Sequence, residues 1–345
     1  MTGLVRPLAA PEPPPGDPVA PPSTAAILAL VADKLEATEA IFRASLGSDV
    51  PFIREAGAYL SDGGGKRVRP ALLLLAARML GHDSDEEVTY AAVVELIHTA
   101  TLIHDDIIDH ADVRRGRATV NRLWGNHKTV LLGDWIYALA MEKALDHDRL
   151  EVVRRLVGAT RRMVEGELMA LERLGAADVG VEEYFAVIER KTAHLFSAAC
   201  SVPALMAPRR PEAEPALARY GRHLGLCFQI VDDLLDFTAR REELGKPVLS
   251  DLKEGKLTLP LILLLPRLDA VRRRLVEHVL EDGDFRRTTA EQVLEMVAAA
   301  GTLGEAAEIA RGHAEAAQRE LAIFPPGDAR DALELAPEML LHRRA

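Results

Sequence analysis

The chain has 345 residues, of which 48% are hydrophobic, and this length and composition allow a sizeable buried core. Its formal net charge of -11 excludes nucleic acid as a partner for the surface as a whole, because binding to phosphate needs clustered positive charge. Aromatic residues make up only 4%, and alternating β-branched runs are scarce, so the composition predicts an almost wholly helical protein.

Residues 1–22 differ in composition from the rest of the chain. They hold eight of the twenty prolines and show almost no periodic apolar pattern. This composition predicts a disordered extension, followed by one domain over residues 23–345.

From residue 23 onward, amphipathic segments follow one another with short breaks at glycine and proline. We expect helices over 23–46, 52–61, 68–81, 85–110, 127–145, 148–173, 181–203, 212–242, 258–282, 288–300, 303–323 and 328–342. No shift in composition marks a domain boundary, and no internal repeat is evident. The prediction is an all-α fold, a single large helical bundle around a central cavity.

Targeting and membrane signals are not evident. The N-terminus lacks a basic flank followed by a continuous apolar stretch, and the apolar run over 257–268 is interrupted by Pro260 and Pro266. Cys200 and Cys227 lie in apolar helical stretches without a metal-binding spacing, and free buried thiols suit a reducing compartment. We therefore expect a soluble cytoplasmic protein without a transmembrane segment.

The same acidic cluster occurs twice, each time in a D-D-x-x-D pattern inside an apolar helical segment. The clusters are Asp105, Asp106 and Asp109 in LIHDDIIDH, and Asp232, Asp233 and Asp236 in FQIVDDLLDF. Residues four apart share a helix face, where like charges repel by roughly a few tenths of a kcal/mol unless a cation lies between them. Because carboxylate oxygen is the ligand that magnesium prefers, the two clusters predict magnesium sites at the mouth of one cavity.

Basic residues accompany both clusters. They are Lys66, Arg67 and Arg69 in GGGKRVRP, Arg114 and Arg115 after the first cluster, and Lys246, Lys253 and Lys256 after the second. Magnesium-binding carboxylates surrounded by lysine and arginine suit a diphosphate, which the metal binds on one side and the guanidinium groups bind on the other.

These motifs, with HTATLIHDDIIDHADVRRGRATVN, LLGDWIY, KTAHLF and GKPVLSDLKEGKLTLP, resemble the trans-polyprenyl diphosphate synthases over residues 25–325. The resemblance implies the isoprenoid synthase fold and a homodimer. It also implies magnesium-dependent condensation of an allylic diphosphate with isopentenyl diphosphate, through an allylic carbocation, to an all-trans polyprenyl diphosphate. The C-terminal PEMLLHRRA lacks the tyrosine common in the family, which puts in doubt a role of the terminus in closing over isopentenyl diphosphate.

The resemblance also assigns roles to single residues. The six aspartates would hold magnesium, three ions per active site, with Asp233 acting through water or another ligand. Isopentenyl diphosphate would be bound by Lys66, Arg69, His98 and Arg115, and the allylic diphosphate by Arg114, Lys246 and Lys256. Oxygen dipoles would be presented to the carbocation at Lys191, Thr192 and Gln229. No protein base is evident, and in the family the departing diphosphate takes the proton.

Product length is expected to depend on the residues below Asp105. Ala100 and Thr101 lie about 6 to 7.5 Å before it along the helix axis, and both are small. In the family a bulky aromatic there stops growth early, so the resemblance implies a medium or long product, such as octaprenyl, with geranylgeranyl or farnesyl as the alternative. Deeper in the tunnel, chain growth could be stopped by Leu96, Ile97, Tyr137 or Met141.

Other polar residues near the motifs are expected to be structural. His104 is expected to make a structural hydrogen bond, and Gly133-Asp134 to pack or cap locally. Polar helix faces are expected for Arg161, Arg162, Glu165, Glu167, Arg240 and Arg241. Asp251 matches an acidic position near the metals in the family.

Three other functions fit the sequence less well. A class I terpene cyclase shares the fold and the first motif, but its second motif is N-D-x-x-S-x-x-x-E, where this chain has DDLLD. A non-catalytic subunit of a heteromeric synthase usually lacks some of the carboxylates or basic residues, and none is missing here. A plain helical scaffold would need neither aspartate cluster.

Overall fold

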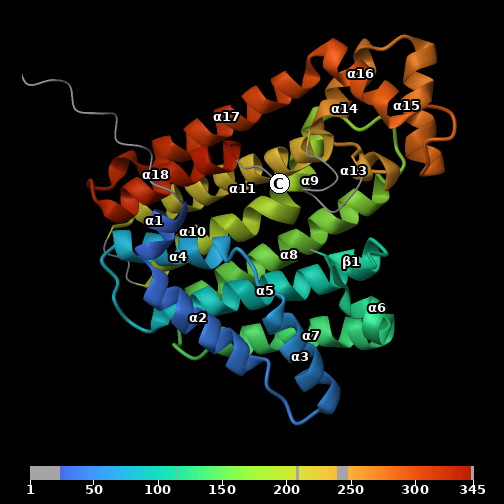
Figure 1. Ribbon diagram of the computed structural model, residues 1–345. Helices are drawn as coiled ribbons and strands as arrows, with labels where there is room; N and C mark the ends of the chain where they lie inside the picture. The colour runs from blue at the N-terminus through green and yellow to red at the C-terminus, as the bar shows by residue number, and fades with distance from the viewer. Residues whose placement is uncertain (1–23, 115, 207–209, 239–247, 343–345) are drawn as a thin grey trace, which may run out of the picture.

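The computed structural model describes residues 24–114, 116–206, 210–238 and 248–342. The longer helices are α2 (Ala32–Ser45), α3 (Pro51–Asp62), α4 (Val68–Met79), α5 (Glu86–Ile108), α7 (Asn126–Ala144), α8 (Leu150–Glu172), α10 (His194–Met206), α11 (Ala213–Thr238), α15 (Ala270–Asp282), α16 (Ala290–Ala300), α17 (Thr302–Glu320) and α18 (Asp328–Leu341). The predicted all-α fold is confirmed (Figure 1).

Short elements connect these helices. They are α1 (Thr24–Ala29), α6 (Val120–Trp124), α9 (Val181–Ile188), α13 (Ser250–Lys253), α14 (Leu259–Leu264), the π-helical η1 (Glu189–Ala193) and the 3-10 turns η2 (Leu265–Arg267) and η3 (Leu321–Ile323). Within the described ranges, the single sheet is an antiparallel pair of short strands, β1 (Val113–Arg114) and β2 (Arg117–Ala118).

Several predicted helices are divided; among them, 181–203 forms α9, η1 and α10, and 303–323 forms α17 and η3. The segment 23–46 forms α1 and α2, because the backbone leaves the helical region at Val31 (φ -130°, ψ 17°). The segment 258–282 forms α14, η2 and α15. The helix tightens to a 3-10 turn around Pro266, whose ring and missing N–H do not suit a helix interior, and the backbone becomes extended at Leu268 (φ -85°, ψ 146°). The sequence does not predict α6 or the β1–β2 hairpin, since both are too short for a periodic pattern. The proposed extension over 1–22 lies outside the described residues.

The helices that carry the aspartate motifs lie inside the bundle. α5 packs against α2, α4, α7 and α10, whereas α11 packs against α10, α17 and α18 (Figure 1). With neighbours on several sides, both helices need more than one apolar face. α10 contacts both of them and so links the two motif helices.

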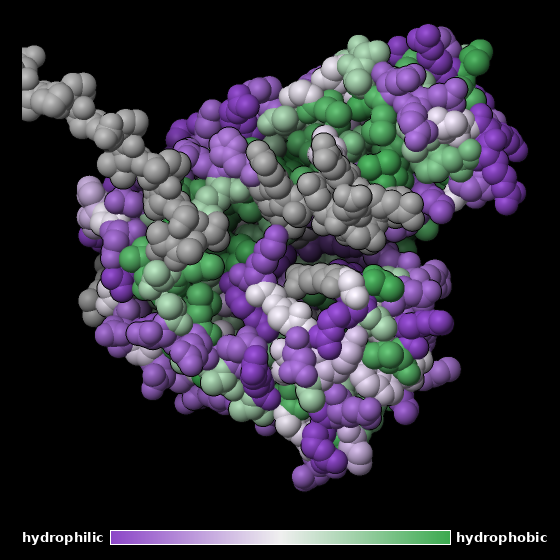
Figure 2. All heavy atoms as spheres, in the orientation of Figure 1, coloured by the Kyte–Doolittle hydropathy of each residue, from purple (hydrophilic) through white to green (hydrophobic). Residues whose placement is uncertain are grey.

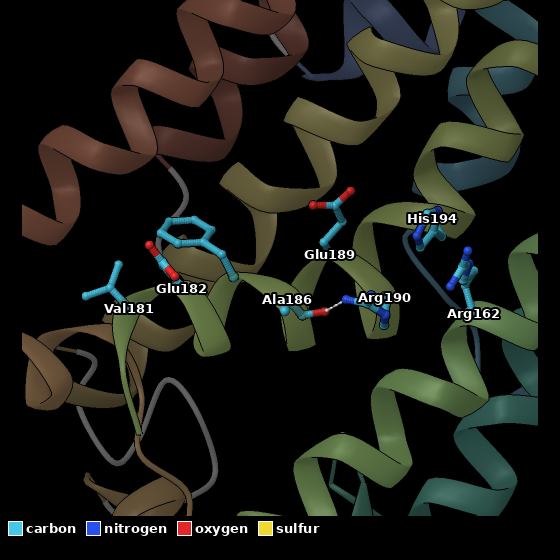
Figure 3. A pocket seen from close by; sticks show the side chains of 8 residues that line it. Arg162, Val181, Glu182, Ala186, Glu189, Arg190 and His194 are labelled. Atoms are coloured by element: carbon cyan, nitrogen blue, oxygen red, sulfur yellow. Dashed lines mark hydrogen bonds between the residues drawn. The ribbon is translucent and has the colours of Figure 1, made fainter. Parts of the chain in front are cut away.

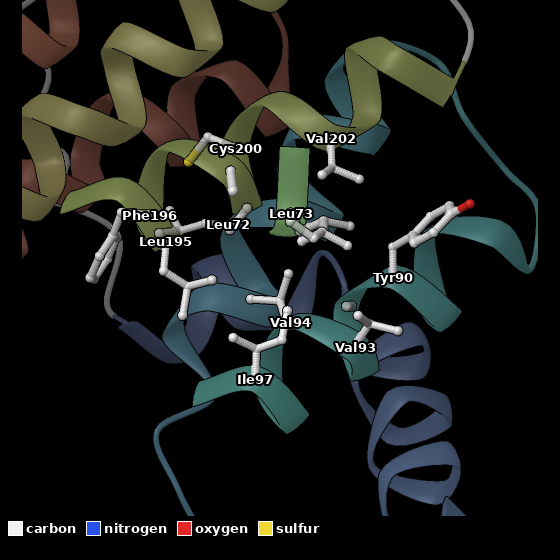
Figure 4. Packing of buried hydrophobic residues seen from close by; sticks show 14 of the residues in the cluster. Leu72, Leu73, Tyr90, Val93, Val94, Ile97, Leu195, Phe196, Cys200 and Val202 are labelled. Atoms are coloured by element: carbon white, nitrogen blue, oxygen red, sulfur yellow. The ribbon is translucent and has the colours of Figure 1, made fainter. Parts of the chain in front are cut away.

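A closely packed apolar core joins α4, α5 and α10 (Figure 4). Leu73, Val94, Ile97 and Phe196 are fully buried in it. Interiors packed this densely resist changes of even one methylene group. The core therefore holds the C-terminal end of α5, where the first aspartate motif lies, in a fixed position.

A separate apolar cluster lies around α13, α15 and α16. It includes Phe237 at the end of α11, Leu249 and Leu252 at the start and inside of α13, and Val276 and Val293 from α15 and α16. Figure 2 shows hydrophilic residues over much of one face of the molecule and several hydrophobic areas, one of them at the upper right, in the region of these helices. This cluster anchors the chain immediately after the second aspartate motif.

Two further sequence expectations can be compared with the structure. None of the helices in the described part of the chain has the length and apolarity needed to cross a bilayer. Cys200 and Cys227 are buried and free, as their apolar surroundings predict.

Candidate active site

The first aspartate motif lies at the end of α5. Asp106 belongs to the last turn of the helix, and Asp109 is its C-cap residue. Arg114 Nε donates to Asp106 Oδ1 over 2.6 Å, and Lys256 Nζ donates to Asp109 Oδ1 over 2.9 Å. The C-terminal end of a helix also carries the negative end of the macrodipole. Both the side chains and the helix therefore favour cations at this position.

Asp105, one turn before Asp109, lies partly buried near other acidic groups. Burial raises the pKa of Asp105 to about 6; Glu167 and Asp109 add to the rise, and Lys191 opposes it. At Asp109, burial alone would raise the pKa, but the Lys256 ammonium holds the pKa of Asp109 below its ordinary value. The negative charge of Asp105 is thus less well compensated by the protein than that of Asp109.

The middle aspartate of the second motif is engaged by the protein on both oxygens. Asp233 is 5% exposed and accepts hydrogen bonds from Tyr184 Oη over 2.6 Å and from Gln229 Nε2 over 2.8 Å. Burial nevertheless raises the pKa of Asp233 to about 7. With both oxygens bonded, Asp233 orients its neighbours, and its indirect contact with a metal stays a prediction. Tyr184 belongs to this network, and no sequence motif points to it.

The outer aspartates of the second motif differ in their surroundings. Asp236 accepts hydrogen bonds from the Ser250 hydroxyl over 2.6 Å, the Ser250 N–H over 3.0 Å and the Asp251 N–H over 3.2 Å. These bonds tie the start of α13 to the end of α11. Asp232 is exposed and, four residues before Asp236, lies on the same face of the helix.

Lys256 connects the two motifs. Its backbone N–H donates to the carbonyl oxygen of Asp251 over 2.8 Å, so it belongs to the α13 turn that Asp236 anchors. Its ammonium pairs with Asp109 of the first motif at 2.9 Å and with Glu254 at 3.0 Å. Lys256 therefore joins Asp109 of the first motif to the turn that Asp236 of the second motif anchors.

The π-helical η1 carries Lys191 and Thr192 into this site. Lys191 Nζ pairs with Glu167 Oε2 at 2.5 Å, and Thr192 Oγ1 donates to Gln229 Oε1 over 2.8 Å. Gly166 allows the close approach of α8, because a Cβ at this position would lie 2.6 Å from the backbone nitrogen of Lys191. Single π turns in helices are frequent at functional sites. The structure brings the three predicted carbocation-facing residues together.

Glu167 corrects one expectation from the sequence. Its side chain is only 13% exposed and pairs with Lys191 beside Asp105, whereas a solvent-exposed helix face was expected. Glu165 does lie on the outer face, where it pairs with Arg161 at 2.7 Å. Residues two apart point to different sides of a helix, so the spacing of the two glutamates was a usable signal.

His104 and Gly133 pack against each other as expected. A Cβ on Gly133 would lie 2.3 Å from His104 Nε2, so only glycine leaves room for the imidazole. His104 Nε2 lies 3.2 Å from the carbonyl oxygen of Val130 and 3.4 Å from Asp134 Oδ1. The histidine joins α5 to α7 and does not belong to the aspartate site.

The basic residues expected to bind isopentenyl diphosphate gather at the start of α4. Arg69 Nη1 lies 3.2 Å from His98 Nε2, and the guanidinium carbon lies 4.4 Å from the ring centroid of Phe196. Stacking of this kind fixes the plane of a guanidinium group. Lys66 is exposed just before the helix. Arg115 and Lys246 lie outside the described residues, and their roles stay predictions.

The residues expected to limit product length lie on α5 and α7, mostly on the faces that pack into the apolar core. Ile97 is fully buried and Ala100 is 2% exposed. Thr101 Oγ1 donates to the carbonyl oxygen of His98 over 2.8 Å, which satisfies its hydroxyl within the helix. Met141 packs from α7 against the same apolar core. Their role in limiting product length stays a prediction.

The donor atoms of the site suit magnesium. Among the residues that the structure describes, no three acidic, histidine or cysteine side chains are gathered closely enough to hold a metal ion. The carboxylates instead hold lysine, arginine and hydroxyl partners, while Asp105 remains a buried acid with a raised pKa. Oxygen-only donors with partly compensated negative charge fit a hard divalent cation.

Two cavities lie near these elements. A small one, of about 120 Å³, has walls that include Arg67, Glu95, His98, Asp106 and Arg114. A larger one, of about 560 Å³, lies between α8, α9 and η1 (Figure 3). Its lining residues are Arg162, Val181, Glu182, Phe185, Ala186, Glu189, Arg190 and His194. No predicted site residue lines the larger cavity, so its size does not mark it as the active site.

Comparisons with known proteins agree with this geometry. The model of the polyprenyl synthetase family matches residues 50–297. Octaprenyl diphosphate synthase of Escherichia coli K12 is 40% identical over 304 residues, which cover 88% of this chain and 94% of that protein. A polyprenyl synthase of Caulobacter crescentus, solved with calcium and isoprenyl diphosphate, superposes with a TM-score of 0.89 at 34% identity, covering 95% of this chain and 100% of that one. A decaprenyl diphosphate synthase of Rhodobacter capsulatus superposes with a TM-score of 0.87 at 36% identity, and the match covers 92% of this chain and 98% of that one.

Proposed function

The chain belongs to the polyprenyl synthetase family, and we propose that it extends an allylic diphosphate with isopentenyl diphosphate to an all-trans polyprenyl diphosphate. Members of this family are prenyltransferases. The observation that carries the proposal is the Lys256 bridge, which unites both aspartate motifs in one site. The octaprenyl and decaprenyl synthases among its relatives support a medium or long product, and we propose octaprenyl.

The family depends on magnesium, which as a Lewis acid neutralises the charge of a leaving diphosphate. We propose that Asp105, Asp106, Asp109, Asp232 and Asp236 hold it, with three ions per site and Asp233 in a supporting role. This assignment is supported by the oxygen-only donor set and by the poorly compensated charge of Asp105.

The basic residues bind the leaving diphosphate directly. Arg114 and Lys256 pair with Asp106 and Asp109, which places a guanidinium and an ammonium group at the mouth of the site. Both groups can turn to phosphate oxygens while the carboxylates bind a cation. This exchange of partners keeps the charges balanced when substrate enters.

The developing carbocation faces oxygen atoms. Because Gln229 Nε2 donates to Asp233, its Oε1 is directed toward Thr192, whose hydroxyl donates to it. A fixed amide oxygen stabilises positive charge without having to reorient during the reaction. Lys66, Arg69 and His98 would hold the diphosphate of isopentenyl diphosphate, so that its double bond attacks the cation.

We also propose an isologous homodimer through α7 and α8. Both helices expose large apolar side chains, of which Leu131 (67%), Leu168 (56%) and Leu150 (55%) are the most exposed. Apolar surface of this kind favours association. Light scattering after size-exclusion chromatography would give the mass, and Leu131→Lys together with Leu168→Lys should yield monomers.

The buried free thiols support our proposal that the protein resides in the reducing cytoplasm.

The proposed function is tested by incubating the protein with magnesium, farnesyl diphosphate and isopentenyl diphosphate and sizing the dephosphorylated alcohols. We expect a ladder of prenols that ends in the medium or long range. Asp105→Asn should abolish it, whereas Asp178→Asn, at a carboxylate with 79% exposure, should not. A stop at geranylgeraniol would indicate a short-chain synthase, and cyclic hydrocarbons would indicate a cyclase. No product with any primer would support a non-catalytic subunit.

A further inference from the structure

Arg67 has an unusual backbone conformation between two residues of the isopentenyl diphosphate site. It follows Lys66, precedes Arg69 by two positions, and serves as the N-cap of α4 with φ 45° and ψ 36°. A side chain other than glycine is disfavoured in this left-handed region. The conformation persists only where surrounding contacts enforce it.

Two carboxylates hold the Arg67 side chain. Its Nη1 donates to Glu95 on α5, and its Nε donates to Glu39 on α2 over 2.8 Å. The guanidinium carbon also lies 4.8 Å from the ring centroid of Phe42. The side chain is 18% exposed and that of Glu95 only 8%. Arg67 therefore fastens the start of α4 to two other helices.

The anchoring point on α5 lies next to the substrate-facing residues. Glu95 is three positions before His98, so the two share one face of α5. Arg69, on the first turn of α4, contacts that same histidine at 3.2 Å. Arg67, Glu95 and His98 also line the same small cavity. The ion pair thus fixes the distance between the two elements that carry Arg69 and His98.

We propose that Arg67 is a positioning residue that sets the geometry of the isopentenyl diphosphate subsite through Glu95 and Glu39. The inference rests on the proposed function. Arg67 turns its guanidinium toward these two carboxylates, while Lys66 and Arg69 are the residues that bind the diphosphate. Its ion pairs hold the left-handed turn, and the turn presents the neighbouring lysine and arginine to the substrate.

A matched ion pair distinguishes positioning from simple stabilisation. Lys34 and Glu87 also join α2 to α5, and the side chain of Glu87 is fully buried. Glu87 lies eight positions before Glu95, about 12 Å farther from the site along the helix axis. Removing the Lys34 pair loosens α2 from α5, whereas removing the Arg67 pairs releases the start of α4 from both of these helices, next to the subsite.

The experiment compares two double variants with the unmodified enzyme. Arg67→Met with Glu95→Gln removes both charges, so that no unpaired charge stays buried. We expect the KM for isopentenyl diphosphate to rise about tenfold, as for loss of one charge-assisted hydrogen bond to the diphosphate. The KM for farnesyl diphosphate and kcat at saturation should stay within about twofold, because only binding of the second substrate is affected. Lys34→Met with Glu87→Gln should leave both KM values unchanged.

A milder variant and a binding measurement make the test independent of folding yield. Glu39→Gln breaks only the more exposed contact and should raise the same KM about threefold. Calorimetric titration with isopentenyl diphosphate alone should show the same loss of affinity.

The inference is overturned if both KM values rise together, if the control pair has the same effect, or if KM stays unchanged in the folded variants. If instead the unmodified protein makes no product with any primer, the proposed function itself is wrong. Failure of the two proposals is therefore distinguishable.

Discussion

Replacing Gly166 with alanine should disturb the site from the α8 side. A Cβ at this position would lie 2.6 Å from the backbone nitrogen of Lys191 and 2.7 Å from the Cβ of Arg190. Ordinary contacts of this type begin near 3.4 Å, so the two segments would have to separate by several tenths of an ångström or more. The neighbour is largely backbone and cannot turn away as a flexible side chain could.

The magnitude follows from two opposing effects. Alanine favours the helix by about 1 kcal/mol relative to glycine, whereas overpacking costs about 1–3 kcal/mol. Gly158 lies on the same helix with no neighbouring atom within 4 Å of its added Cβ, so Gly158→Ala should show only the stabilisation that alanine brings to the helix. Gly166→Ala should therefore be about 1–3 kcal/mol less stable than Gly158→Ala.

Activity should separate the two variants further. Displacement of η1 moves Lys191 and Thr192, so we expect kcat of Gly166→Ala to fall by about tenfold or more, with kcat of Gly158→Ala unchanged. Chemical denaturation measures the stability difference, and a steady-state assay with magnesium and both substrates measures kcat. Equal stability and equal kcat in the two variants would refute the close-packing argument.

Three further predictions concern the aspartate site. Lys256→Met should lower kcat by about tenfold to a hundredfold. It should also shift the acid limb of the rate profile to higher pH, because burial raises the pKa of Asp109 once the Lys256 ammonium is gone. Lys253→Met, at an exposed lysine, should have neither effect. Protons should compete with magnesium at Asp105, whose pKa is about 6. Below pH 6, the magnesium concentration that gives half-maximal rate should therefore rise about tenfold per pH unit, and a magnesium requirement that does not change with pH would contradict this. Ala100→Phe, at a position 2% exposed, should shorten the product to about the farnesyl or geranylgeranyl stage, and unchanged prenol length in chromatography would remove the idea.

Much of the fold follows from local pattern. The periodic apolar residues of α5, α8 and α11 predict three long helices, and the structure places each within a few residues of the predicted range. The breaks at Val31 and Pro266 and the short α6 are less visible, because one residue or one turn of chain gives too little periodicity to read. Local sequence thus determines which segments are helical more firmly than where each one ends.

The sequence by itself determined the chemistry of the site. Two D-D-x-x-D patterns on helices fix the spacing of the carboxylates, because helix geometry alone sets which side chains share a face. That spacing, with the nearby lysines and arginines, is sufficient to indicate a metal-assisted reaction of a diphosphate. No knowledge of the packing is needed for this step.

Only the tertiary structure decided how these groups are paired. Lys256 meets Asp109, Glu167 meets Lys191, and Arg67 meets a buried glutamate on another helix. Each contact joins residues far apart in the chain and depends on how closely the helices approach, as at Gly166. The physical reason is that an ion pair forms or fails within a few ångströms, and such distances result from the packing of the whole bundle.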